Sequence, residues 1–100
     1  MDPGALLVLG VKKSDDPNQA REDYAAMACA VQNMSLFLKS EGYGTKWGTG
    51  KIIRADETYS ILGIDKNKIE IVGLFWVGKY DVEPIKPERP SIENFITHLE

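Results

Sequence analysis

The sequence predicts an α+β or α/β fold in which a small sheet is covered by helices. Residues 5–12 and 69–79 form two apolar runs whose length and composition are typical of buried strands. Between them, residues 19–42 contain no proline, and their only glycine is the last residue, which indicates a long helix. Strands and helices in this order favour a sheet packed against helices.

The first run, residues 5–12, reads ALLVLGVK and is too hydrophobic to alternate between core and solvent. We therefore expect a central strand that is covered on both faces. A second strand is expected over residues 69–79, again apolar on both faces, with Gly73 and Gly78 marking close packing or a bulge. Two strands alone do not make a stable sheet, so further strands must pair with them.

The helix expected over residues 19–42 carries apolar residues at the i, i+3, i+4 and i+7 spacing from Tyr24 onward. Alanines and other apolar residues also occupy its remaining faces. This pattern predicts a helix that is buried nearly all round, with its alanines against another helix or a second subunit. Cys29 in this segment is interpreted as a buried helix residue rather than a reactive thiol.

Residues 41–50, EGYGTKWGTG, contain four glycines directly after the expected helix. Gly42 is expected to end the helix in the left-handed conformation, and Gly44 to let the chain reverse. Gly48 and Gly50 flank Thr49 where the helix has already ended, beside an indole and two lysines. This second pair of glycines predicts either a structural turn or bare backbone that binds a flat, polar-edged aromatic ring.

Beyond this stretch, a short helix is expected that Asp56 caps and Gly63 ends. After the second strand, three prolines within residues 84–90 predict an extended arm. Ser91 is expected to cap a last short helix that runs through His98.

Charge and composition exclude several classes of function. The net charge of −3, from 15 acidic and 12 basic residues without a basic stripe, argues against nucleic-acid binding. No apolar run approaches the roughly 18 residues of a membrane span, and Asp2 stands where a signal peptide carries positive charge. We therefore expect a cytoplasmic protein with no membrane partner. Cys29 as the sole cysteine excludes an internal disulfide, and with His98 it provides too few ligands for a zinc site.

Three stretches resemble, in succession, motifs of the FMN-dependent nitroreductases of the YdjA-like subgroup. AMACAVQNMSLFLKSEGYGTKWGTG is similar to an alanine-rich helix with a Gln-Asn pair that leads into L-G-Y-G-[ST]-x-W-x-[ST]-G. LGIDKNKIEIVGLFWVGKY is similar to a later strand segment of the family, and PIKPERPSIENFI to its proline-rich, arginine-bearing end. The resemblance covers residues 5–99 in the family's order.

The resemblance implies an α+β nitroreductase-like fold that forms an intertwined homodimer or larger assembly, with FMN in a cleft at the dimer interface. It also implies that NADH or NADPH reduces the FMN, which then reduces a nitroaromatic, quinone or similar small-molecule acceptor. No side chain is expected to act as an acid or base, because the cofactor carries the chemistry. By this resemblance, the loop that lies along the flavin corresponds to Trp47, Gly48, Thr49 and Gly50. The contact to the FMN phosphate corresponds to Arg89, assisted by Lys86.

This sequence differs from the family's pattern at two places that bear on these site assignments. The family commonly has a basic or polar residue where this chain has Gly48, so one side-chain contact is missing. The family's first half carries an R-[RS]-S-x-R phosphate segment, and residues 1–20 contain nothing similar. Residues 1–100 are therefore interpreted as one nitroreductase-like domain without the N-terminal half. The alternatives are a flavin enzyme completed by the other half, a flavin-free remnant that dimerises or binds a partner, and a truncated gene product.

Overall fold

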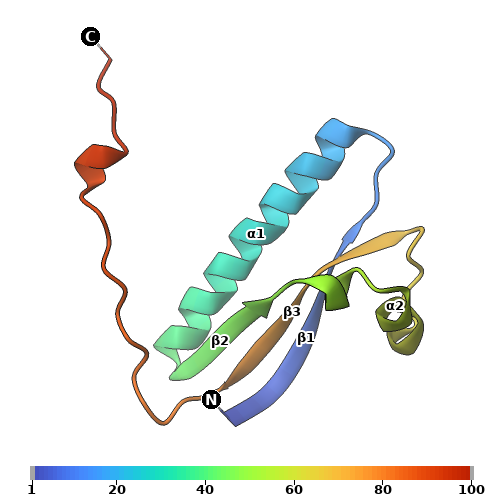
Figure 1. Cartoon of the computed structure of the whole chain (residues 1–100), viewed down its shortest axis with the longest axis horizontal. Helices are drawn as coiled ribbons and strands as arrows, with labels where there is room; N and C mark the ends of the chain where they lie inside the picture. The colour runs from blue at the N-terminus through green and yellow to red at the C-terminus, as the bar shows by residue number, and fades with distance from the viewer. Residues whose placement is uncertain (1, 100) are drawn as a thin grey trace.

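The computed structural model describes residues 2–99, which form a three-stranded sheet with a long helix on one face. Figure 1 shows the sheet and the long helix side by side, with an extended C-terminal arm that leaves the body of the protein. The elements in chain order are β1 (Asp2–Lys12), α1 (Pro17–Ser40), β2 (Tyr43–Gly48), the 3-10 turn η1 (Lys51–Ile53), α2 (Asp56–Leu62), β3 (Ile69–Lys79) and the 3-10 turn η2 (Ile92–Asn94).

The central strand of the sheet is β3, which pairs antiparallel with β1 on one side and with β2 on the other. The bounds predicted for this strand, 69–79, are confirmed. The prediction that residues 5–12 form a central strand was wrong. In the described part of the chain β1 lies at the sheet edge, and the side chains of Leu6 and Leu7 are 44% and 41% exposed.

The third strand, β2, comes from the glycine-rich stretch that the sequence predicted as a turn or loop. Gly42, with φ of 90°, ends α1 in the left-handed conformation as predicted. Gly44 was predicted to let the chain reverse, but it lies within β2 opposite Gly78 and does not adopt a positive φ. The stretch also contains Tyr43, Thr45 and Trp47, and aromatic and β-branched residues favour strands when a neighbouring edge is open.

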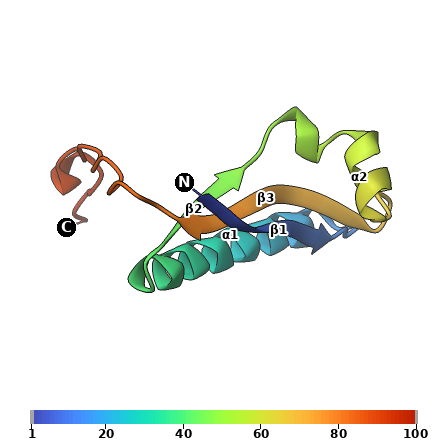
Figure 2. The same ribbon diagram turned by 90° about the horizontal axis from the view of Figure 1, so that it is seen from below.

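Helix α1 covers one face of the sheet, which Figure 2 shows from below. Asp16 caps it by accepting a hydrogen bond from the backbone N–H of Asn18 at 2.9 Å. Its inner face packs Val31 against Leu9, Val72 and Phe75. The predicted burial all round is not found within this chain, because the sheet covers only one side of the helix. Its outer residues are exposed, among them Leu36, Phe37 and Cys29, so the prediction of a buried Cys29 was also wrong.

A bulge in β3 lets this strand bury residues on both faces of the sheet. Leu9 pairs with Gly73 and Gly10 with Ile71, so Val72 has no partner on β1. The extra residue shifts the alternation of side chains, as β-bulges do. Val72 and Phe75 consequently pack toward α1, whereas Ile71 and Leu74 pack with Ile53 and Tyr59 on the other face. The prediction that Gly73 marks a bulge or close packing is confirmed.

Turn η1 and helix α2 cover the second face at one end of the sheet (Figure 2). Gly63 ends α2 in the left-handed conformation, with φ of 69°, as predicted. Asp56 was wrongly predicted as the cap of α2. The N-cap is Ala55, which forms no side-chain bond, and the Asp56 carboxylate accepts a hydrogen bond from Lys66 at 2.6 Å instead.

The arm that follows β3 is extended, as its prolines predicted, and residues 81–99 are exposed throughout. Ser91 accepts a hydrogen bond from the N–H of Glu93, but the helix expected through His98 is only the short turn Ile92–Asn94. Among residues 2–99, no helix combines the length and apolar character that a membrane crossing requires.

Candidate functional site

The loop after β2 changes direction at Gly50, whose backbone angles are φ 114° and ψ −161°. Few residues other than glycine adopt this conformation. A Cβ on Gly50 would have no other heavy atom within 4 Å, so the backbone is open on this side. Gly48 differs, because it pairs with Leu74 and a Cβ there would lie 3.3 Å from the Leu74 carbonyl oxygen. The fold itself therefore explains why both positions are glycine, and at Gly50 the backbone is also left accessible.

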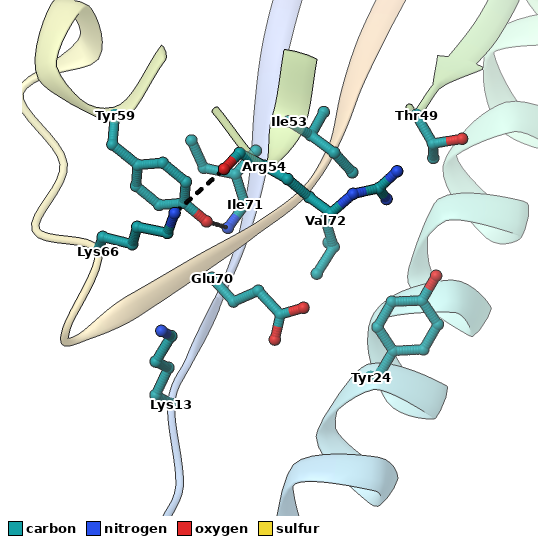
Figure 3. Close-up of a pocket in the computed structure, with 10 residues that line it drawn as sticks. All are labelled: Lys13, Tyr24, Thr49, Ile53, Arg54, Tyr59, Lys66, Glu70, Ile71 and Val72. Carbon is teal, nitrogen blue, oxygen red and sulfur yellow. Dashed lines mark hydrogen bonds between the residues drawn. The ribbon is translucent and has the colours of Figure 1, made fainter. Parts of the chain in front are cut away.

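Thr49, between these glycines, lines a cavity of about 530 Å³. The cavity lies where β2 has ended, since β2 pairs only with the second half of β3, from Leu74 onward. Its volume is in the range of small-molecule sites, which are mostly apolar with a few polar groups. Figure 3 shows the residues that line it, which are Lys13, Tyr24, Thr49, Ile53, Arg54, Tyr59, Lys66, Glu70, Ile71 and Val72.

Polar groups in the cavity wall are held by short hydrogen bonds. The hydroxyl of Tyr59 accepts a bond from the backbone N–H of Ile71 at 2.6 Å. Lys66 donates to the Asp56 carboxylate and, at 3.1 Å, to the backbone oxygen of Arg54. The bond to Asp56 raises the pKa of Lys66 above its usual value, and the same contact lowers the pKa of Asp56. Lys66 is therefore held at the cavity wall as one half of an ion pair with Asp56.

Trp47 does not line this cavity. Its indole lies on the α1 face of the sheet, beside the cluster of Val72 and Phe75. The indole N–H donates a hydrogen bond to the backbone oxygen of Val72 at 3.0 Å. A Cβ on Gly73 would overlap Nε1 and Cδ1 of the indole, so the ring packs directly on bare backbone.

Lys86 and Arg89 lie on the exposed arm, and this chain does not bring them to the loop of Thr49. The arm leaves the end of β3 that pairs with Tyr43, whereas the loop follows the opposite end of β2 (Figure 1). Lys39 holds the base of the arm by donating hydrogen bonds to the hydroxyl of Tyr80 at 2.5 Å and to the carboxylate of Glu83 at 2.9 Å.

The same two contacts, with Tyr80 first, raise the pKa of Lys39 above its usual value. Its ammonium also lies 4.5 Å from the centre of the Tyr80 ring. Lys39 thus joins the end of α1 to the base of the arm, although an exposed contact of this kind contributes little stability.

Sequence reasoning missed Tyr59 and Arg54 as cavity residues. No spacing signal identifies Tyr59, because its partner is a backbone group twelve residues away on another element. Arg54 follows the glycine loop by only four positions, and a cation so near a candidate ligand loop was a signal that could have been used.

Comparisons with known proteins agree with this architecture. A sequence model of the Nitroreductase family matches residues 2–79. The Bacillus subtilis (strain 168) protein named "Putative NAD(P)H nitroreductase YfhC" is 31% identical over 98 residues, which are 97% of this chain and 49% of YfhC. A crystal structure described as a nitroreductase-like family protein from Bacillus cereus superposes with a TM-score of 0.88 at 25% identity.

That superposition covers 95% of this chain and 50% of the Bacillus cereus chain. The chain therefore spans about half the length of both relatives. The predicted resemblance and the α+β nitroreductase-like fold are confirmed. Because the family model matches most of the sequence, this chain belongs to the nitroreductase family.

Proposed function

We propose that this chain forms part of a cytoplasmic FMN-dependent oxidoreductase that uses NADH or NADPH to reduce nitroaromatic, quinone or related acceptors. The observation that carries the proposal is the position of Thr49, because this residue belongs to the loop that the family resemblance assigns to the flavin and lines the cavity of about 530 Å³. The name of the Bacillus subtilis relative, "Putative NAD(P)H nitroreductase YfhC", supports the same activity.

The residues of the loop and cavity fit a flavin ring. Ile53, Ile71 and Val72 offer apolar surface, and the open backbone at Gly50 can approach a flat ring closely. Thr49 and the backbone of Gly48 and Gly50 would hold the ring edge. When bound, FMN would supply the hydride chemistry, and the protein would bind it, orient it and exclude water.

A second copy of the chain is proposed to supply the phosphate contacts. Lys86 and Arg89 lie on an exposed arm that leaves the end of β3 far from the loop, so we infer that one FMN meets both sites only across two chains or after the arm moves. The outer face of α1, with Leu36 and Phe37 more than half exposed, offers apolar surface for such a contact.

We therefore expect light scattering of the purified chain to show a dimer or larger assembly, because 100 residues cannot cover this apolar surface. A well-folded monomer at micromolar concentration would contradict the expectation. The control is Phe37→Asp, which places a charge on the outer face of α1 and is expected to shift the protein toward monomers.

We propose that this chain is a nitroreductase-like domain without the N-terminal half of its relatives, and that the complete enzyme requires that half. The alternative function is a flavin-free remnant that dimerises or binds a protein partner. Two observations favour this alternative: Gly48 and Gly50 have structural reasons of their own, and the chain spans about half of YfhC.

A titration of FMN against Gly50→Ala separates these functions. Alanine at φ 114° is expected to cost about 1–3 kcal/mol of stability. Gly50 directly follows Thr49 of the cavity wall, and we propose that the added methyl group would obstruct the ring there. We expect the wild-type chain to retain the visible absorbance of FMN after desalting, and the variant to retain much less.

The matched control is Gly42→Ala, which has φ of 90° and equally open space but lies away from the cavity. It should lose comparable stability and keep the wild-type affinity for FMN. A wild-type chain that retains no flavin, or two variants with the same affinity, would favour the flavin-free remnant.

A further inference from the structure

We propose that Trp47 and Tyr59 are positioning residues that hold both ends of the cavity loop, residues 48–58, against the bulge of β3. The inference rests on the proposed function, since the loop matters most if it binds FMN. It assigns Trp47 a role different from direct contact with the flavin and adds Tyr59, which the sequence did not single out.

The first end of the cavity loop is held by Trp47. Its indole N–H is committed to the Val72 oxygen at 3.0 Å, and its ring packs on Gly73. The ring also contacts the core that α1 shares with Phe75. An indole held on this side of the sheet is not among the groups that line the cavity, so its effect on a ligand there acts through the chain that follows it.

The second end of the cavity loop is held by Tyr59 of α2. Its side chain is 5% exposed, and its hydroxyl accepts the N–H of Ile71 at 2.6 Å. Ile71 and Val72 are neighbours at the bulge, in the part of β3 that does not pair with β2. Buried backbone groups without a partner are costly, and the two side chains take the place of the missing strand.

The segment between these anchors carries Thr49, Ile53 and Arg54 into the cavity. Because both ends are bonded to adjacent residues of one strand, the loop is ordered before any ligand arrives. A binding site that is ordered in advance avoids the entropic cost of ordering it on binding. Loss of either anchor should therefore weaken binding even though neither anchor bond is made to the ligand.

The test uses two variants that keep the aromatic ring and remove one hydrogen bond, Trp47→Phe and Tyr59→Phe. Each is expected to raise the dissociation constant for FMN by about threefold to tenfold, the effect of one lost hydrogen bond. Each should also speed amide hydrogen exchange within residues 49–54. The double variant should lose less than the product of the two effects, because both anchors order the same loop.

The matched control is Trp76→Phe, which changes the other indole of the chain and leaves both anchor bonds in place. It should keep the affinity for FMN and the exchange rates of the loop. All titrations are made well below the melting temperature of each variant, so that a loss of global stability does not change the affinity.

If Trp47 instead contacted the flavin directly through its ring, Trp47→Phe should keep the affinity for FMN and the exchange rates of the loop, because phenylalanine keeps an aromatic ring. Wild-type affinity and wild-type exchange in Trp47→Phe would overturn the proposal. If the wild-type chain binds no FMN, the proposed function fails, but the exchange rates still decide the positioning role. Unchanged exchange in both variants would then overturn the inference by itself.

Discussion

Replacing Gly73 with alanine is expected to lower the free energy of unfolding by about 1–3 kcal/mol or more, as insertion of a methyl group into a packed core does. A Cβ at this position would overlap Nε1 and Cδ1 of Trp47. Gly73 is buried at the centre of β3, so the backbone has little freedom to move away. The indole must leave its place, and with it the hydrogen bond to Val72 is lost.

Urea unfolding of Gly73→Ala in two backgrounds tests this cause. In a Trp47→Leu background the indole is absent, so Gly73→Ala should cost much less than in the wild-type background. Gly4→Ala is the control, because its Cβ would meet only the Val77 oxygen at 3.7 Å, an ordinary contact. The same cost for Gly73→Ala in both backgrounds would show that Trp47 is not the obstacle.

Arg89→Ala is expected to weaken FMN binding by about tenfold to a hundredfold and riboflavin binding hardly at all. A charge-assisted hydrogen bond is worth about 1.5–3 kcal/mol, and riboflavin has the ring of FMN without its phosphate. The prolines of the arm stiffen it, so little freedom is lost when Arg89 is held against a phosphate. The exposed side chain of Arg89 makes no ion pair among residues 2–99, so stability should not change.

Both flavins are titrated against the wild-type chain, Arg89→Ala and Lys68→Ala. Lys68 is an exposed cation that lies away from the arm and does not line the cavity, so its loss controls for net charge. Equal loss of FMN and riboflavin in Arg89→Ala, or no loss of either, would show that Arg89 is not the phosphate ligand.

Local sequence patterns were sufficient for several elements of the fold. Residues 69–79 were predicted as a strand with the bounds that β3 has, because an apolar run of this length that is rich in β-branched and aromatic residues is typical of a buried strand. The expected helix over residues 19–42 matches α1 (Pro17–Ser40) closely, and Gly42 and Gly63 end their helices in the left-handed conformation. These features depend on neighbouring residues alone, and such information is present in a single stretch of sequence.

The candidate site was predictable only in part, for the same reason. The glycines around Thr49 marked the loop, and the structure places Thr49 in a cavity wall. The contribution of Tyr59 was not visible, because it reaches the cavity from α2 and its partner is the backbone of β3, whereas Arg54 lies close enough to the glycine loop in sequence to have been considered. The roles of Lys86 and Arg89 stay predictions, since their arm lies apart from the cavity in this chain.

The sequence by itself thus determined the long helix, the strand at residues 69–79, the glycines that end two helices and the extended arm. Only the tertiary structure decided that Tyr43–Gly48 is a strand, that β1 lies at an edge, and that Val72 bulges. These features depend on pairing between segments far apart in the chain. A glycine-rich stretch becomes a strand or a loop according to whether an open edge lies beside it, and here β3 provides that edge.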